Sequence, residues 1–153
     1  MSSQLLLTDR LAQLSPNAQR IALIYGIVYP LAPSQTRVIQ WLNQTPALVT
    51  PKSLAIAMRD TIAELVEAGV LEPPQTGGGY RANKEFSATL IRHAHSLGYL
   101  APLLKVLNRD AFIMDWGQAQ GTSEMYLRCA LLSGDYEWMH KPEHDTSRRK
   151  FHL

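Results

Sequence analysis

Apolar residues between Thr50 and Asn83 recur first with the period of a helix and then with that of a short strand pair. Spacings of three and four place one set of side chains on a single helix face: Leu54, Met58, Ile62 and Leu65. Thr50 suits the N-cap of this helix and Pro51 its first turn, while Gly69 suits the left-handed residue that ends it. The pattern predicts an amphipathic helix with one buried face.

The residues after Gly69 predict a β-hairpin. Val70 and Leu71 are typical of a short first strand, and residues 80–82 can return as the second strand. The glycines at 77–79 supply a flexible tip between the two. A capped helix is therefore expected to lead directly into a glycine-tipped hairpin.

This order of elements resembles the winged helix-turn-helix superfamily. The residues that carry the resemblance match the end of the recognition helix and the entry into the wing of that superfamily: Ile62, Leu65, Gly69, Val70 and Leu71. The resemblance covers roughly half of the chain. It implies a mainly α fold with a small β-hairpin and, as a function, binding to double-stranded DNA.

Further helices are predicted before Thr50. Residues 4–14 have the periodicity of a short lead-in helix, and Ser15 then caps a helix that ends before Pro30. Ser34 or Thr36 opens the next helix, whose Val38, Ile39, Trp41 and Leu42 can pack inward. The connection to Thr50 is longer than the tight turn of DNA-binding helix-turn-helix units, which makes a different angle between the two helices an alternative.

The second half of the chain is predicted to be mainly helical. Helices are expected over residues 87–97, ended by Gly98, over residues 100–107, and from Thr122 or Ser123 to Gly134. Residues 110–121 fit a strand, a helix or a packed loop equally well. The expected organisation is a lead-in helix (1–14), a winged-helix domain (15–86), a helical extension (87–140) and a polar basic tail (141–153).

Composition and charge narrow the class of protein. The chain has 153 residues, enough to bury a core without disulfides or metal, and its formal net charge is +2. Cys129 has no cysteine partner, and no stretch of about eighteen apolar residues occurs. We therefore expect a cytoplasmic protein with no membrane partner. The chain being a fragment of a larger multidomain protein is an alternative.

Candidate DNA contacts lie on the exposed side of the predicted recognition helix and on the wing. They are Lys52, Ser53, Arg59, Arg81 and Lys84. The alternative is that they form a solvated surface, with Arg59 paired to Asp60 or Glu64. Asp60, Glu64 and Glu67 would repel a phosphate backbone and argue against insertion of the whole helix into a groove.

Aromatic and apolar residues near the end of the chain favour a second type of partner. Tyr136, Trp138 and Met139 have little sequence after them that could cover them. They are candidate contacts for a protein partner or for a homodimer, and the alternative is that they pack on the helical half. A protein-interaction or dimerisation module is therefore the rival to the DNA-binding module.

Catalytic and cofactor-binding patterns are not evident in the sequence. His93 and His95 would point apart on a helix and cannot share one metal ion, and Cys129 is expected to be a small core residue. The glycines at 77–79 are not followed by the Lys-Ser/Thr pair of a phosphate-binding loop. We therefore expect no enzyme activity, no cofactor and no metal.

Overall fold

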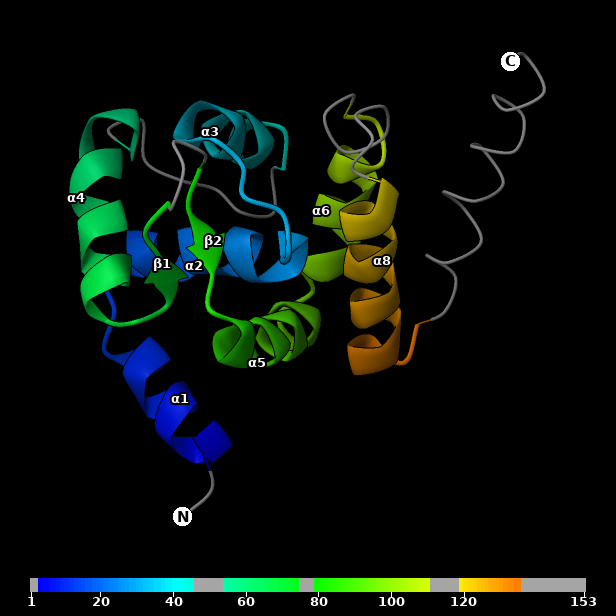
Figure 1. The fold of residues 1–153 in the computed structure, drawn as a ribbon, viewed down its shortest axis with the longest axis horizontal. Helices are drawn as coiled ribbons and strands as arrows, with labels where there is room; N and C mark the ends of the chain where they lie inside the picture. Colours follow the sequence, from blue (N-terminus) through cyan, green and yellow to red (C-terminus); the bar gives the residue numbers. More distant parts are fainter. Residues whose placement is uncertain (1–2, 46–53, 75–78, 111–118, 136–153) are drawn as a thin grey trace.

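The computed structural model describes the backbone of residues 3–45, 54–74, 79–110 and 119–135 (Figure 1). Within these ranges the chain is mainly helical, with a two-stranded antiparallel sheet, as the sequence predicted. The elements in chain order are α1 (Ser3–Ala12), α2 (Pro16–Val28), α3 (Gln35–Asn43), α4 (Leu54–Glu67), β1 (Leu71–Glu72), β2 (Arg81–Ala82), α5 (Lys84–Ser96), α6 (Leu100–Leu107) and α8 (Ala119–Ser133).

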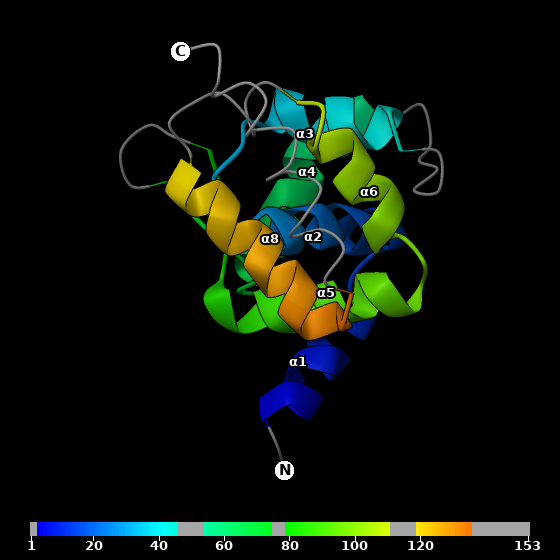
Figure 2. The same cartoon turned by 90° about the vertical axis from the view of Figure 1, so that its right-hand side faces the viewer.

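Helix α2 lies at the centre of the molecule. Every residue from Ile21 to Val28 is buried, so this helix is covered on all sides. Figures 1 and 2 show α2 behind the hairpin, with α4 beyond one end, α5 beneath it and α8 across its other end. The apolar core therefore forms around α2, and the other elements are positioned by packing against it.

Local capping signals determine where several helices begin and end. Ser15 caps α2 by accepting a hydrogen bond from the Ala18 N–H, and Ser34 caps α3 through the Arg37 N–H. Gly69 ends α4 with a φ of 81°, a left-handed conformation that glycine adopts without strain. These positions confirm the predicted caps at Ser15, Ser34 and Gly69. Thr50 and Pro51, the predicted start of α4, lie outside the described residues.

Helices α2 and α5 approach each other most closely at Gly26. A Cβ atom placed on Gly26 would lie 2.4 Å from the Cβ of Leu90, so only glycine fits at this crossing. The Ser87 hydroxyl of α5 donates a buried hydrogen bond of 2.8 Å to the Gly26 carbonyl. The absence of a side chain at Gly26 therefore brings the side chains of Leu90 and Ser87 directly onto the α2 backbone.

Arg128 of α8 joins the same junction. Its guanidinium donates to the Ser87 hydroxyl at 2.9 Å and lies 5.1 Å from the centre of the Tyr29 ring. The Cys129 side chain beside it is buried against the Ile27 carbonyl of α2. Helices α2, α5 and α8 thus meet through one small polar cluster inside the apolar core.

Asp110, which follows α6 in the chain, contacts two side chains of α3. One carboxylate oxygen accepts a hydrogen bond of 2.7 Å from the indole N–H of Trp41, and the other pairs with Arg37 at 3.1 Å. Trp41 is fully buried, so its N–H requires an acceptor inside the protein. This double contact fixes α3 relative to the second half of the chain.

The hairpin lies against the connection between α2 and α3. Leu71 pairs with Ala82 and Glu72 with Arg81 in the antiparallel ladder. A Cβ on Gly79 would overlap the carbonyl group of Pro33. The segment just before β2 therefore contacts this connection through backbone atoms. The hairpin therefore packs closely on the body of the protein near its second strand.

Helix positions differ from the sequence predictions in two places. Helix α5 begins at Lys84 and not at Ser87, because Asn83 accepts a hydrogen bond from the Glu85 N–H and acts as its N-cap. Helix α8 begins at Ala119, before the expected cap at Thr122 or Ser123. Residue 86, the expected end of the winged-helix domain, lies within the first turn of α5. The division into domains stays a prediction.

No helix in the described ranges is long and apolar enough to cross a membrane. This agrees with the absence of a long apolar run in the sequence. The longest described helix, α8, has 15 residues and includes polar side chains throughout its length.

Replacement of Gly26 by alanine tests the close contact between α2 and α5. The intrinsic helix preference of alanine would raise the free energy of unfolding by about 0.5–1 kcal/mol. The contact with the Leu90 Cβ acts in the opposite direction, and overpacking of this kind costs about 1–3 kcal/mol. We expect Gly26→Ala to lower the free energy of unfolding measured by urea denaturation. An increase would contradict the close approach.

Candidate nucleic-acid interface

Helix α4 has a buried face and an exposed face. Met58, Ile62 and Leu65 are buried in the core, as the sequence predicted, together with the less obvious Thr61. The exposed positions in the described part of the helix are Arg59, Asp60, Ala63 and Glu67. The helix thus presents a mixed surface with one cation, one small residue and two carboxylates.

Glu64 does not belong to this exposed acidic set, because it bonds to the start of α2. Its two carboxylate oxygens accept hydrogen bonds of 2.8 Å from the backbone N–H and from the hydroxyl of Ser15. In many helices a Glu three residues after the N-cap accepts the N-cap N–H. Ala18 occupies that position in α2, and Glu64 of α4 supplies the missing carboxylate.

This arrangement replaces the pairing of Arg59 with Glu64 that the sequence had offered as an alternative. Glu64 lies five residues after Arg59, and its carboxylate points to Ser15. The sequence contains one signal of this contact, which is the absence of an acidic residue in the first turn of α2. It does not reveal which distant carboxylate fills the place.

Arg81 lies on β2 and forms an ion pair with Glu72 on the neighbouring strand. The guanidinium and the carboxylate are 3.3 Å apart, and the two side chains are 46% and 45% exposed. A pair this exposed holds the side chains only weakly, so Arg81 can exchange Glu72 for another anion. Its position on the hairpin agrees with the sequence prediction.

Lys84 is the first residue of α5 and not part of the hairpin. It is exposed and follows Asn83, the N-cap of that helix. It nevertheless lies two residues after the end of β2. Lys84 therefore stays close to the hairpin along the chain, although a helix and not a strand positions it.

Five further predicted contacts fall outside the part of the chain that the structure describes. They are Lys52 and Ser53 before α4 and Tyr136, Trp138 and Met139 after α8. Their proposed roles stay predictions. Of the candidate DNA contacts, the structure places Arg59 on α4, Arg81 on β2 and Lys84 on α5.

The described residues contain no group of three or more His, Cys, Asp or Glu side chains that could hold a metal ion. Cys129 is a core residue, and burial raises the pKa of its thiol to about 12. A nucleophilic cysteine requires a thiolate and access to a substrate, and Cys129 has neither. Burial also raises the pKa of the Tyr25 and Tyr126 hydroxyls above their usual range.

Comparison with known proteins gave no match: no family model, no curated protein and no solved structure corresponds to this chain. The similarity to the winged helix-turn-helix superfamily therefore rests on the residues described above. Any assignment of function likewise depends on the chain's own surface and packing.

The burial of Cys129 predicts a very slow reaction with thiol reagents. At pH 8 a thiol with a pKa of about 12 is ionised to about one part in ten thousand. We expect labelling by a disulfide reagent to be at least a hundredfold slower in buffer than in urea, with Cys129→Ala as the unlabelled control. Rapid labelling in buffer would show that the thiol is accessible.

The same pKa shift gives a direction for stability. The unfolded thiol ionises near its ordinary pKa of 9.0, while the folded thiol stays protonated to higher pH. The contribution of Cys129 is therefore complete below pH 9 and is lost as the pH rises from there.

Proposed function

We propose that this chain is a DNA-binding module without catalysis of its own, with a winged helix over residues 15–86 and a helical extension to residue 140. The observation that carries the proposal is the order α2, α3, α4, β1, β2 together with the exposed face of α4. A helix that is packed on one side and free on the other, followed directly by a hairpin, is the arrangement that winged helices use to contact a duplex.

The hydrogen bonds of Glu64 strengthen this proposal. Because its carboxylate is held by Ser15, the negative charge of Glu64 is directed toward the start of α2 and not toward the exposed face of α4. Arg59 lies on that face, and Ala63, one turn further on, is small enough to allow a close approach of the phosphate backbone. Asp60 and Glu67 still oppose deep insertion of the helix.

Binding of this kind depends on few cations. Arg59, Arg81 and Lys84 are exposed, and Lys52 and Ser53 precede the described part of α4. Each phosphate contact contributes about 0.9 to the slope of log affinity against log salt. Because the number of phosphate contacts is small, we expect modest affinity for DNA of any sequence. The slope of log affinity against log salt should report the number of these contacts.

The test is a fluorescence anisotropy titration of a labelled random-sequence duplex at two salt concentrations. We expect the double variant Arg59→Gln/Lys84→Gln to weaken binding several-fold. It should also reduce the slope of log affinity against log salt by the amount that corresponds to about two phosphate contacts. The matched control is Lys105→Gln/Arg109→Gln, which removes two exposed cations at α6 and the residues just after it. Equal losses in both variants, or no binding by the native protein at low salt, would overturn the proposal.

Self-association is the second candidate function, favoured by an exposed apolar strip on α8. Leu127 and Leu131 are four residues apart on the same helix face, and 41% and 58% of their surfaces are exposed. Exposed leucines at this spacing are typical of helices that pair with another helix. Tyr136, Trp138 and Met139, the predicted contacts for a protein partner or homodimer, follow soon after in the sequence.

Light scattering at several protein concentrations tests this second function. We expect the native chain to dimerise and Leu127→Gln/Leu131→Gln to shift it to the monomer, because the substitutions remove apolar area from the contact. Leu97→Gln is the matched control, since Leu97 is a similarly exposed leucine at the end of α5. Trp138→Ala examines the following segment. A native chain that stays monomeric at every concentration would exclude dimerisation.

A further inference from the structure

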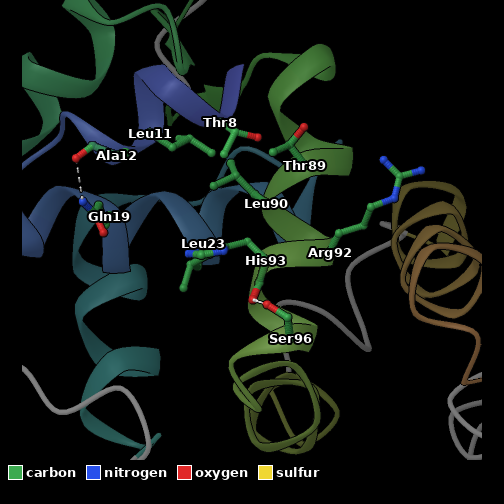
Figure 3. Close-up of a pocket in the computed structure, with 10 residues that line it drawn as sticks. All are labelled: Thr8, Leu11, Ala12, Gln19, Leu23, Thr89, Leu90, Arg92, His93 and Ser96. Atoms are coloured by element: carbon green, nitrogen blue, oxygen red, sulfur yellow. Dashed lines mark hydrogen bonds between the residues drawn. The ribbon is translucent and has the colours of Figure 1, made fainter. Parts of the chain in front are cut away.

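A cavity of about 440 Å³ lies between α1, α2 and α5 (Figure 3). This volume is within the range of about 300–1,000 Å³ that is usual for small-molecule sites. Its lining includes no residue of α4, of the hairpin or of α8, so it belongs to neither proposed interface. The lining residues come from all three helices and include Leu11, Leu23, Leu90, Arg92 and His93.

Three leucines form the apolar part of the lining, one from each helix. Leu11, Leu23 and Leu90 are only 8%, 3% and 1% exposed, although each borders the cavity. Figure 3 shows Leu11 and Leu90 extending into the space between α1 and α5. An apolar guest placed against these side chains would lose its own contact with water, which is a source of affinity in such sites.

Polar groups line the remainder, and two of them are engaged in holding the local structure. The Gln19 amide donates to the Leu14 carbonyl at 2.9 Å and to the Ala12 carbonyl at 3.5 Å, across the turn between α1 and α2. The Ser96 hydroxyl donates to the His93 carbonyl at 2.9 Å. The imidazole of His93, an exposed residue, lies beside Leu23 at the edge of the cavity, where a ring nitrogen can donate a hydrogen bond (Figure 3).

The charges of the lining favour an anionic group. No aspartate or glutamate occurs among the lining residues, whereas Arg92 of α5 supplies a cation. Figure 3 shows the Arg92 side chain extending away from Leu23, so its charge acts from the rim and not by contact. A carboxylate would be attracted by this rim, and an ammonium group would be repelled.

We propose that this cavity binds a small carboxylate with an aliphatic body. The body lies against Leu11, Leu23 and Leu90, and the carboxylate accepts a hydrogen bond from the His93 imidazole. Because α1 supplies one wall, an occupied cavity also stabilises the docking of α1 on α2 and α5. This binding is independent of the proposed contact with DNA.

Three probes with the same apolar body and different heads test the proposal: octanoate, octan-1-ol and octylammonium. In isothermal titrations of the native protein we expect octanoate to bind with one-to-one stoichiometry and about tenfold more tightly than octylammonium. Octan-1-ol is expected to lie between the two. No binding of octanoate at millimolar concentration, or equal affinity for octanoate and octylammonium, would overturn the proposal.

Two pairs of variants locate the binding. His93→Gln is expected to weaken octanoate about tenfold and to leave octan-1-ol unchanged, while His95→Gln, at an exposed histidine outside the cavity, changes neither. Ala12→Trp places a large side chain at an exposed lining position and should abolish both, whereas Ala101→Trp on the exposed side of α6 should not. Equal effects within either pair would place the binding elsewhere.

Discussion

The close contact of α5 side chains with the α2 backbone at Gly26 is the constraint on which the rest of the structure depends. Because no Cβ separates the two helices, Leu90 rests directly on α2 and Ser87 reaches the Gly26 carbonyl. Arg128 then bonds to Ser87, which brings α8 to the same place. The central helix is buried on every side, and Gly26 lets one of its neighbours approach it closely.

Signals that act within a few residues made most of the fold predictable. Ser15 and Ser34 mark helix starts through their own hydroxyl groups, and Gly69 marks a helix end through a left-handed backbone that glycine accepts readily. The start of α5 was misplaced because Asn83 is equally suited to a turn after a hairpin and to an N-cap. Only the packed structure shows which role Asn83 takes.

The sequence predicted which face of α4 is buried, but it did not predict the partners of the charged side chains in the candidate interface. The periodicity of α4 identified its buried face, since Met58, Ile62 and Leu65 repeat at helical spacing. The partners of Glu64 and Arg81 could not be read from that periodicity, because Ser15 lies 49 residues from Glu64 and the strand register decides which residue faces Arg81. The cavity beneath α1 could not be predicted from the sequence either, because its walls come from three helices.

Asp110 makes the two halves of the chain dependent on each other. Trp41 lies in the predicted winged-helix domain, yet the acceptor for its buried indole N–H comes from the residue range after α6. A chain cut after residue 86 would leave that N–H without its acceptor and would remove most of α5 from the surface of α2. The helical extension therefore belongs to the same core as α2 and α3, and transplanting residues 15–86 alone into another protein would carry an incomplete core.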